Sequence, residues 1–114
     1  MATQRTHHIT IDPFAPLGQQ PTVGHNRWHE DIEPVLEVDP GDLVVFDTLD
    51  AFDAAVPRSM SHAEVATLDL GPVHPVTGPV IVRGAEAGDL LEVHIHEIEA
   101  DPWDNHGYTA EVPG

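Results

Sequence analysis

Prolines and glycines divide this chain into short segments, and no other feature of the sequence limits its fold as strongly. The 114 residues include 11 Pro and 9 Gly, which lie between short apolar runs. Proline has no backbone donor and a fixed φ, and glycine weakens the interior of helices and strands alike. The pattern predicts an all-β fold of the β-sandwich or jelly-roll-like kind, made of short strands with one short helical turn.

Six runs rich in branched and apolar residues predict the strands. These runs cover residues 6–11, 35–38, 43–49, 80–82, 90–99 and 107–112. The run 90–99 is the longest, and its alternation places Leu91, Val93 and Ile95 on a face that is expected to be buried.

Turn and cap residues mark the breaks between these runs. Residues 61–64, Ser-His-Ala-Glu, have capping-box spacing and predict a short helix over residues 61–67. Residues 39–42 and 84–89 predict two turns, in which glycine adopts positive φ. Each turn ends in Gly-Asp and leads directly into an apolar run, so the two following strands are expected to begin in a similar way. The remaining connections are predicted loops, at residues 12–24, 50–59 and 68–79.

Charge and cysteine content exclude several classes of protein. Four Arg, no Lys and 20 acidic residues give a formal net charge of −16. Phosphate neutralisation needs a basic face, and an anionic membrane would repel this chain, so neither nucleic acid nor membrane is an expected partner. The absence of Cys excludes disulfides, thiolate nucleophiles and Cys-type zinc sites. No run approaches the ~20 apolar residues of a spanning helix or resembles a secretory signal, so a cytoplasmic location is expected.

Residue types that could act in catalysis or bind a ligand are concentrated in residues 25–31, His-Asn-Arg-Trp-His-Glu-Asp. His25 and His29 could chelate a metal if the segment were helical, whereas a loop would leave their geometry open. An alternative interpretation is a solvated loop that Trp28 anchors. A second candidate is Thr77, because the prolines around it predict a rigid loop that either offers its hydroxyl to a ligand or forms only a turn.

The remaining histidines include one further candidate pair. His94 and His96 are two residues apart on the longest predicted strand, so they share a face with Glu92 and could hold a metal ion. The alternative is that these three residues form the solvated face of that strand. His7 and His8 are interpreted as surface residues without function.

Eight short motifs occur in a characteristic order along the chain. They are His25-Asn26-Arg27-Trp28-His29, Asp31-Ile32, Pro40-Gly41-Asp42, Asp69-Leu70, His74, Thr77-Gly78-Pro79, Gly84-Ala85-Glu86 and Gly88-Asp89-Leu90-Leu91. From about residue 20 onward, their order and spacing resemble the N-terminal region of formamidases in the acetamidase/formamidase family. The later motifs of that family, Gly-Gly-Asn-x-Asp and Gly-Asp-x-His followed by Gly-Asp-Gly-Glu, do not occur in this sequence.

The resemblance implies a metal-associated hydrolase that cleaves the C–N bond of small linear or cyclic amides, in an oligomer. Because only the first third of the family pattern is present, the chain is expected to be a small subunit or an N-terminal part. It would be active only with a larger chain that carries the C-terminal motifs. That missing part would also bind most of a divalent metal, expected to be zinc. Residues 1–24 would form an N-terminal strand and a Pro/Gly-rich arm, and residues 25–114 the β module of the amidohydrolase.

The resemblance and the residue types also suggest roles for single residues. His25 is expected to act as a metal ligand or as an acid/base, and His29 is its nearest alternative. Trp28 would line the apolar side of the pocket, and Asn26 would hydrogen-bond the amide. A second function stays open, that of a non-catalytic β-sandwich module for binding or scaffolding, which could bind metal through its histidines.

Overall fold

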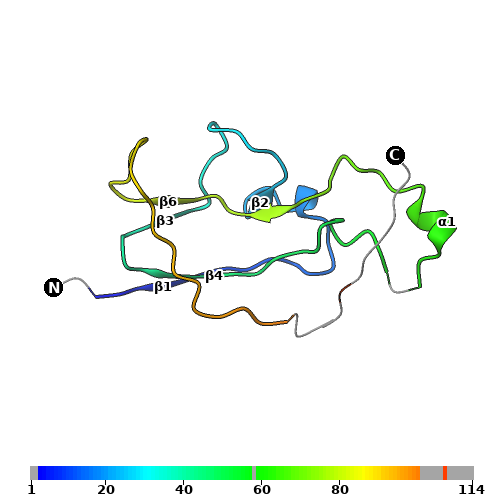
Figure 1. Cartoon of the computed structure of the whole chain (residues 1–114), viewed down its shortest axis with the longest axis horizontal. Coiled ribbons are helices and arrows are strands. Elements are labelled where there is room, and N and C mark those ends of the chain that lie inside the picture. The colour runs from blue at the N-terminus through cyan, green and yellow to red at the C-terminus, as the bar shows by residue number, and fades with distance from the viewer. Residues whose placement is uncertain (1–2, 58, 101–106, 108–114) are drawn as a thin grey trace.

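The computed structural model describes residues 3–57, 59–100 and 107. Most of the regular secondary structure in this part of the chain is short strands, which confirms the all-β class (Figure 1). The strands are β1 Thr6–Ile9, β2 Gly24–His25, β3 Leu36–Val38, β4 Leu43–Phe46, β5 Val76–Thr77 and β6 Val80–Val82. A 3-10 turn, η1, covers Leu17–Gln19, and one helical turn, α1, covers His62–Val65. Neither is long and apolar enough to cross a membrane.

The strands pair between distant parts of the chain. β1 and β4 are parallel, β3 and β6 are parallel, and β2 and β5 are antiparallel. Figure 1 shows the β3–β6 pair on one side and the β1–β4 pair on the other, with residues 39–42 crossing between them. Because β5 and β6 are nearly consecutive, the β2–β5 pair continues the side formed by β3 and β6.

The buried core is small and centres on Leu17. Its side chain is only 2% exposed, and its backbone N–H donates to Oδ1 of the buried Asp53 at 2.6 Å. Leu17 lies against Gly24, which has no Cβ to obstruct it. The other buried apolar side chains are Ile9, Ile11, Val38 and Val65. This core fixes the start of β2, where the candidate segment begins.

Several predicted elements are confirmed. β1, β3, β4 and β6 lie inside the predicted runs, although β1 ends at Ile9 and β4 at Phe46. The predicted helix is shorter than expected, but its cap is present, since Ser61 Oγ accepts from the backbone N–H of Glu64 at 3.3 Å. β5 lies in a predicted loop, and β2 begins at the end of another and continues into His25, whose conformation the sequence left open; each has only two residues.

The prediction for residues 90–99 is wrong for the described structure. This run forms no strand, and Leu91, Val93 and Ile95 are exposed rather than buried. The apolar alternation is present, but no other segment of the described chain pairs with it. The predicted strand at 107–112 lies outside the described residues except for Gly107.

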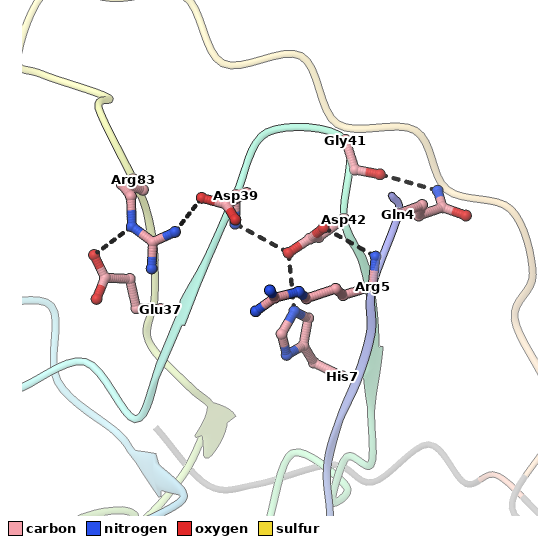
Figure 2. Close-up of polar contacts among 8 residues, drawn as sticks. All are labelled: Gln4, Arg5, His7, Glu37, Asp39, Gly41, Asp42 and Arg83. Atoms are coloured by element: carbon pink, nitrogen blue, oxygen red, sulfur yellow. Dashed lines mark hydrogen bonds and ion pairs between the residues drawn. The ribbon is translucent and has the colours of Figure 1, made fainter. Parts of the chain in front are cut away.

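A carboxylate ties the N-terminal strand to the turn between β3 and β4 (Figure 2). Asp42 accepts from the backbone N–H groups of Arg5 at 3.1 Å and Asp39 at 3.0 Å. His7 Nε2 lies 3.0 Å from the same carboxylate, whose side chain is only 4% exposed. The bond to His7, followed by those to Arg5 and Asp39, lowers the pKa of Asp42 to about 2. His7 therefore has a structural role that the sequence interpretation missed.

Beside this cluster, Arg83 links β6 to β3 (Figure 2). Its guanidinium contacts the carboxylates of Asp39 and, at 3.4 Å, Glu37. The hydrogen bond to Asp39 is the main cause that raises the pKa of Arg83. Since these side chains are partly exposed, we expect them to orient the strands more than to stabilise them.

Removing the charge of Asp42 is expected to destabilise the chain in a pH-dependent way. The folded state keeps Asp42 ionised below its usual pKa of 3.8, so this stabilisation is complete above about pH 4 and is lost as pH falls towards 2. The melting temperatures of wild type and Asp42→Asn should therefore differ most near neutral pH and converge towards pH 2. Asp89→Asn is the matched control, because Asp89 accepts the same turn bond, from Glu86 N–H, without a contact to β1. Equal effects of the two variants would contradict this role.

Candidate functional site

The pairing of β2 with β5 brings two of the predicted site regions together. Gly24 lies opposite Thr77, and His25 lies opposite Val76. Gly78 N–H also donates to the carbonyl of Val23 at 2.9 Å. The start of the segment 25–31 is therefore held beside the loop that carries Thr77.

Thr77 is buried at this junction. Its hydroxyl donates to the carbonyl oxygen of Asp47 at 2.5 Å, so it ties β5 to the residue that follows β4. The backbone N–H of Asp47 in turn donates to Ile9 in β1. Thr77 thus connects the β2–β5 pair to the β1–β4 pair.

Two side chains tether the segment after β2 to a single carbonyl. Asn26 Nδ2 donates to the Gly71 oxygen at 2.8 Å, and Arg27 Nη1 donates to the same oxygen at 3.2 Å. Arg27 Nη1 also donates to the carbonyl of Asn26 at 3.0 Å. Gly71 N–H is itself held by Asp69 Oδ1 at 2.9 Å. The sequence interpretation missed Gly71, because a backbone acceptor has no side-chain signature.

The imidazoles of His25 and His29 are each oriented by a backbone N–H two residues further along the chain. His25 Nδ1 accepts from Arg27 N–H at 3.3 Å, and His29 Nδ1 accepts from Asp31 N–H at 3.0 Å. A neutral imidazole that accepts at Nδ1 carries its proton on Nε2. Because Nδ1 faces a backbone N–H in each ring, Nε2–H lies on the other side of the ring. His25 is half-buried and His29 is exposed. Each neutral ring can then donate a hydrogen bond through Nε2–H, and its imidazolium form can donate a proton.

A metal ion fits these residues poorly. A histidine that binds a metal through Nε2 has its proton on Nδ1 and donates it to a second group, whereas Nδ1 of His25 and His29 accepts a hydrogen bond here. Across the described residues, no three His, Cys, Asp or Glu side chains are grouped to hold a metal ion. The segment is also not helical, so the predicted chelation by residues four apart has no basis in this structure.

Trp28 does not anchor the segment. Its side chain is 93% exposed, so the alternative interpretation of a loop anchored by Trp28 is wrong. An exposed indole offers a large apolar ring together with a polar N–H, a combination enriched at interfaces. The segment 25–29 is thus held at the Gly71 carbonyl by Asn26 and Arg27, while the Trp28 side chain is exposed.

The histidine pair at 94 and 96 lies on one exposed face, as predicted. The two rings stack with their centroids 6.4 Å apart, and His94 Nε2 is 2.7 Å from Glu92 Oε1. This alternation shows an extended backbone, because side chains two residues apart lie on the same face. The three groups do not form a metal-binding set.

Comparisons with known proteins agree on one family. Residues 10–113 match the sequence model of the Acetamidase/Formamidase family. The acetamidase of Mycolicibacterium smegmatis is 36% identical over 97 residues, which are 85% of this chain and 24% of that protein. The formamidase of Methylophilus methylotrophus is 34% identical over 93 residues, 79% of this chain and 23% of that protein.

A solved structure supports the same grouping. The gamma lactamase from Delftia acidovorans superposes with a TM-score of 0.60 at 37% identity, covering 71% of this chain and 20% of the lactamase. The chain spans about a quarter of the length of the relatives it matches, and the match is to their N-terminal portion.

Proposed function

Because the chain belongs to the acetamidase/formamidase family, we propose that it is the small subunit of an amide hydrolase that cleaves the C–N bond of small amides. The observation that carries this proposal is its similarity, over 79% to 85% of its length, to an acetamidase and a formamidase. A larger chain would supply the remaining part of the fold, in a cytoplasmic oligomer. A divalent metal, for which we propose zinc, would bind to that larger chain and would polarise the amide carbonyl.

The segment 25–29 would form one wall of the substrate pocket. With Asn26 Nδ2 bound to Gly71, the amide oxygen of Asn26 stays available to accept a hydrogen bond from a substrate N–H. His25 would act as the acid in its imidazolium form, in which Nδ1 carries a proton and no longer accepts from Arg27 N–H. It would give the Nε2 proton to the nitrogen that leaves as ammonia when the C–N bond breaks, and the water that adds to the carbonyl carbon would return a proton to it. Trp28, exposed in the isolated chain, would exclude water from the completed pocket.

A chimera tests this function without requiring the natural partner. In the acetamidase of Mycolicibacterium smegmatis, the N-terminal segment that matches this chain is replaced by the chain itself. We expect the chimera to hydrolyse acetamide, and the same enzyme with the segment deleted to be inactive. Size-exclusion chromatography and circular dichroism check that the chimera assembles and folds as the parent enzyme does. A folded, assembled and inactive chimera would contradict the proposal and favour a non-catalytic module.

A further inference from the structure

The turn after β3 has a defined hydrogen-bond pattern. Asp42 N–H donates to the carbonyl of Asp39 at 3.1 Å, and Asp39 N–H donates back to Asp42 Oδ2 at 3.0 Å. Gly41 has a φ of +90°, which a residue with a Cβ rarely adopts. The chain then enters β4.

The turn after β6 repeats this pattern. Asp89 N–H donates to the carbonyl of Glu86 at 3.0 Å, Glu86 N–H donates to Asp89 Oδ2 at 2.9 Å, and Gly88 has a φ of +97°. β3 and β6 are themselves paired in parallel, but only the first turn begins directly after its strand. The second begins at Glu86, after a further turn in which Ala85 N–H donates to the carbonyl of Val82 at 3.1 Å. In chain order, residues 90 onward therefore follow β6 and a Gly-Asp turn as β4 follows β3 and the first Gly-Asp turn.

β4 and residues 90–98 differ in what lies beside them. β4 is paired in parallel with β1, and the N–H groups of Leu43 and Asp47 donate to Arg5 and Ile9 at 2.9 and 3.0 Å. Residues 90–98 have no backbone hydrogen-bond partner within the described chain. Within the described chain, residues 90–98 thus have no strand beside them as β4 has β1.

Residues 90–98 also expose five large apolar side chains, three of which share one face. Leu90 is 97% exposed and Ile98 86%, and Leu91, Val93 and Ile95 are 60% to 74% exposed. The last three alternate with Glu92, His94 and His96, whose contacts show the extended backbone. An extended segment with free backbone groups and one apolar face is a template for an added strand.

We infer that residues 90–98 are the docking strand for the larger chain, one of whose β-strands pairs with it in parallel as β1 pairs with β4. This rests on the proposed function, since the occupant is the part of the amidase fold that makes up about three quarters of the relatives. A second copy of this chain is a poorer occupant, because two chains of formal charge −16 repel each other. In the docked state Asp89 would accept from the first N–H of the added strand, as Asp42 accepts from Arg5.

A two-chain experiment tests the inference. The full chain is co-expressed with the Mycolicibacterium smegmatis acetamidase from which the matching N-terminal segment has been deleted, and co-elution and amide hydrogen exchange are measured. We expect the two polypeptides to co-elute and exchange at residues 90–98 to slow relative to the chain alone. Val93→Glu should weaken association at least ~10-fold, because it places a charge on the buried apolar face. His94→Glu adds the same charge on the opposite face and should leave association intact.

The outcomes separate this inference from the proposed function. Equal co-elution of wild type and Val93→Glu would place the contact elsewhere and overturn the inference, even if the assembly hydrolyses acetamide. Association that Val93→Glu abolishes, in an assembly without activity, would support the docking strand and contradict the function. No association of the wild-type chain would overturn the inference, and so would a homodimer that Val93→Glu disperses, since the occupant would then be a second copy.

Discussion

His25→Ala is expected to lower the kcat of the two-chain assembly on acetamide by at least ~100-fold while leaving the assembly intact. His25 follows Gly24 directly on β2, and its ring is oriented by the Arg27 N–H, so Nε2–H has a defined direction. Alanine removes the proton donor but not the tether of the segment, which depends on Asn26 and Arg27. The measurement is steady-state ammonium release, normalised to assembled complex.

A matched variant identifies the cause of any loss. His62→Ala removes another exposed imidazole, on the single helical turn, and should leave kcat unchanged. Normal turnover of His25→Ala would show that His25 is not the acid, and His29→Ala would then be the next variant to measure. Loss of assembly, with unchanged activity per assembled complex, would make the segment 25–29 an interface rather than a site.

Gly24→Ala is expected to lower the free energy of unfolding by about 1–3 kcal/mol, as overpacking of a filled core does. A Cβ at this position would lie 2.6 Å from Leu17 Cγ and 2.9 Å from Leu17 Cδ1. Leu17 is 2% exposed and cannot move aside freely, because its backbone is held by Asp53. The change also displaces β2, so the activity of the assembly should fall with stability.

Urea unfolding of the chain measures this effect. Gly18→Ala is the control, since nothing lies within 4 Å of a Cβ at that position. Combining Gly24→Ala with Leu17→Ala should cost less than the sum of the single changes, because the smaller side chain makes room for the methyl group. A Gly24→Ala variant as stable as Gly18→Ala, or additive costs in the double variant, would contradict the packing described here.

The strands that could be predicted from sequence are those with strong local signals. β3, β4 and β6 are rich in branched residues, and the turn at residues 39–42 follows from Pro-Gly-Asp. Residues 90–99 have the same local signals, but strand formation depends on a partner, and the described chain supplies none for this run. β2 and β5 were missed because a two-residue strand has no periodicity to detect.

In the candidate site, too, local features could be predicted from the sequence and non-local contacts could not. The family was predictable from the order of short motifs, and the match over residues 10–113 confirms it. The segment 25–29 was identified by its residue types, but its tether to Gly71 and its position beside Thr77 come from non-local pairing. The hydrogen bonds at Nδ1 of His25 and His29 depend on loop geometry, so the sequence left the choice between metal ligand and acid/base open.

The hydrolysis of acetamide by the two polypeptides together tests most directly whether this chain is a working part of an amidase. The full chain and the truncated Mycolicibacterium smegmatis acetamidase are assayed separately and as the purified assembly, with ammonium and acetate both quantified. We predict equal amounts of ammonium and acetate from the assembly and neither product from either polypeptide alone. A purified assembly that contains both polypeptides and releases neither product would contradict this account.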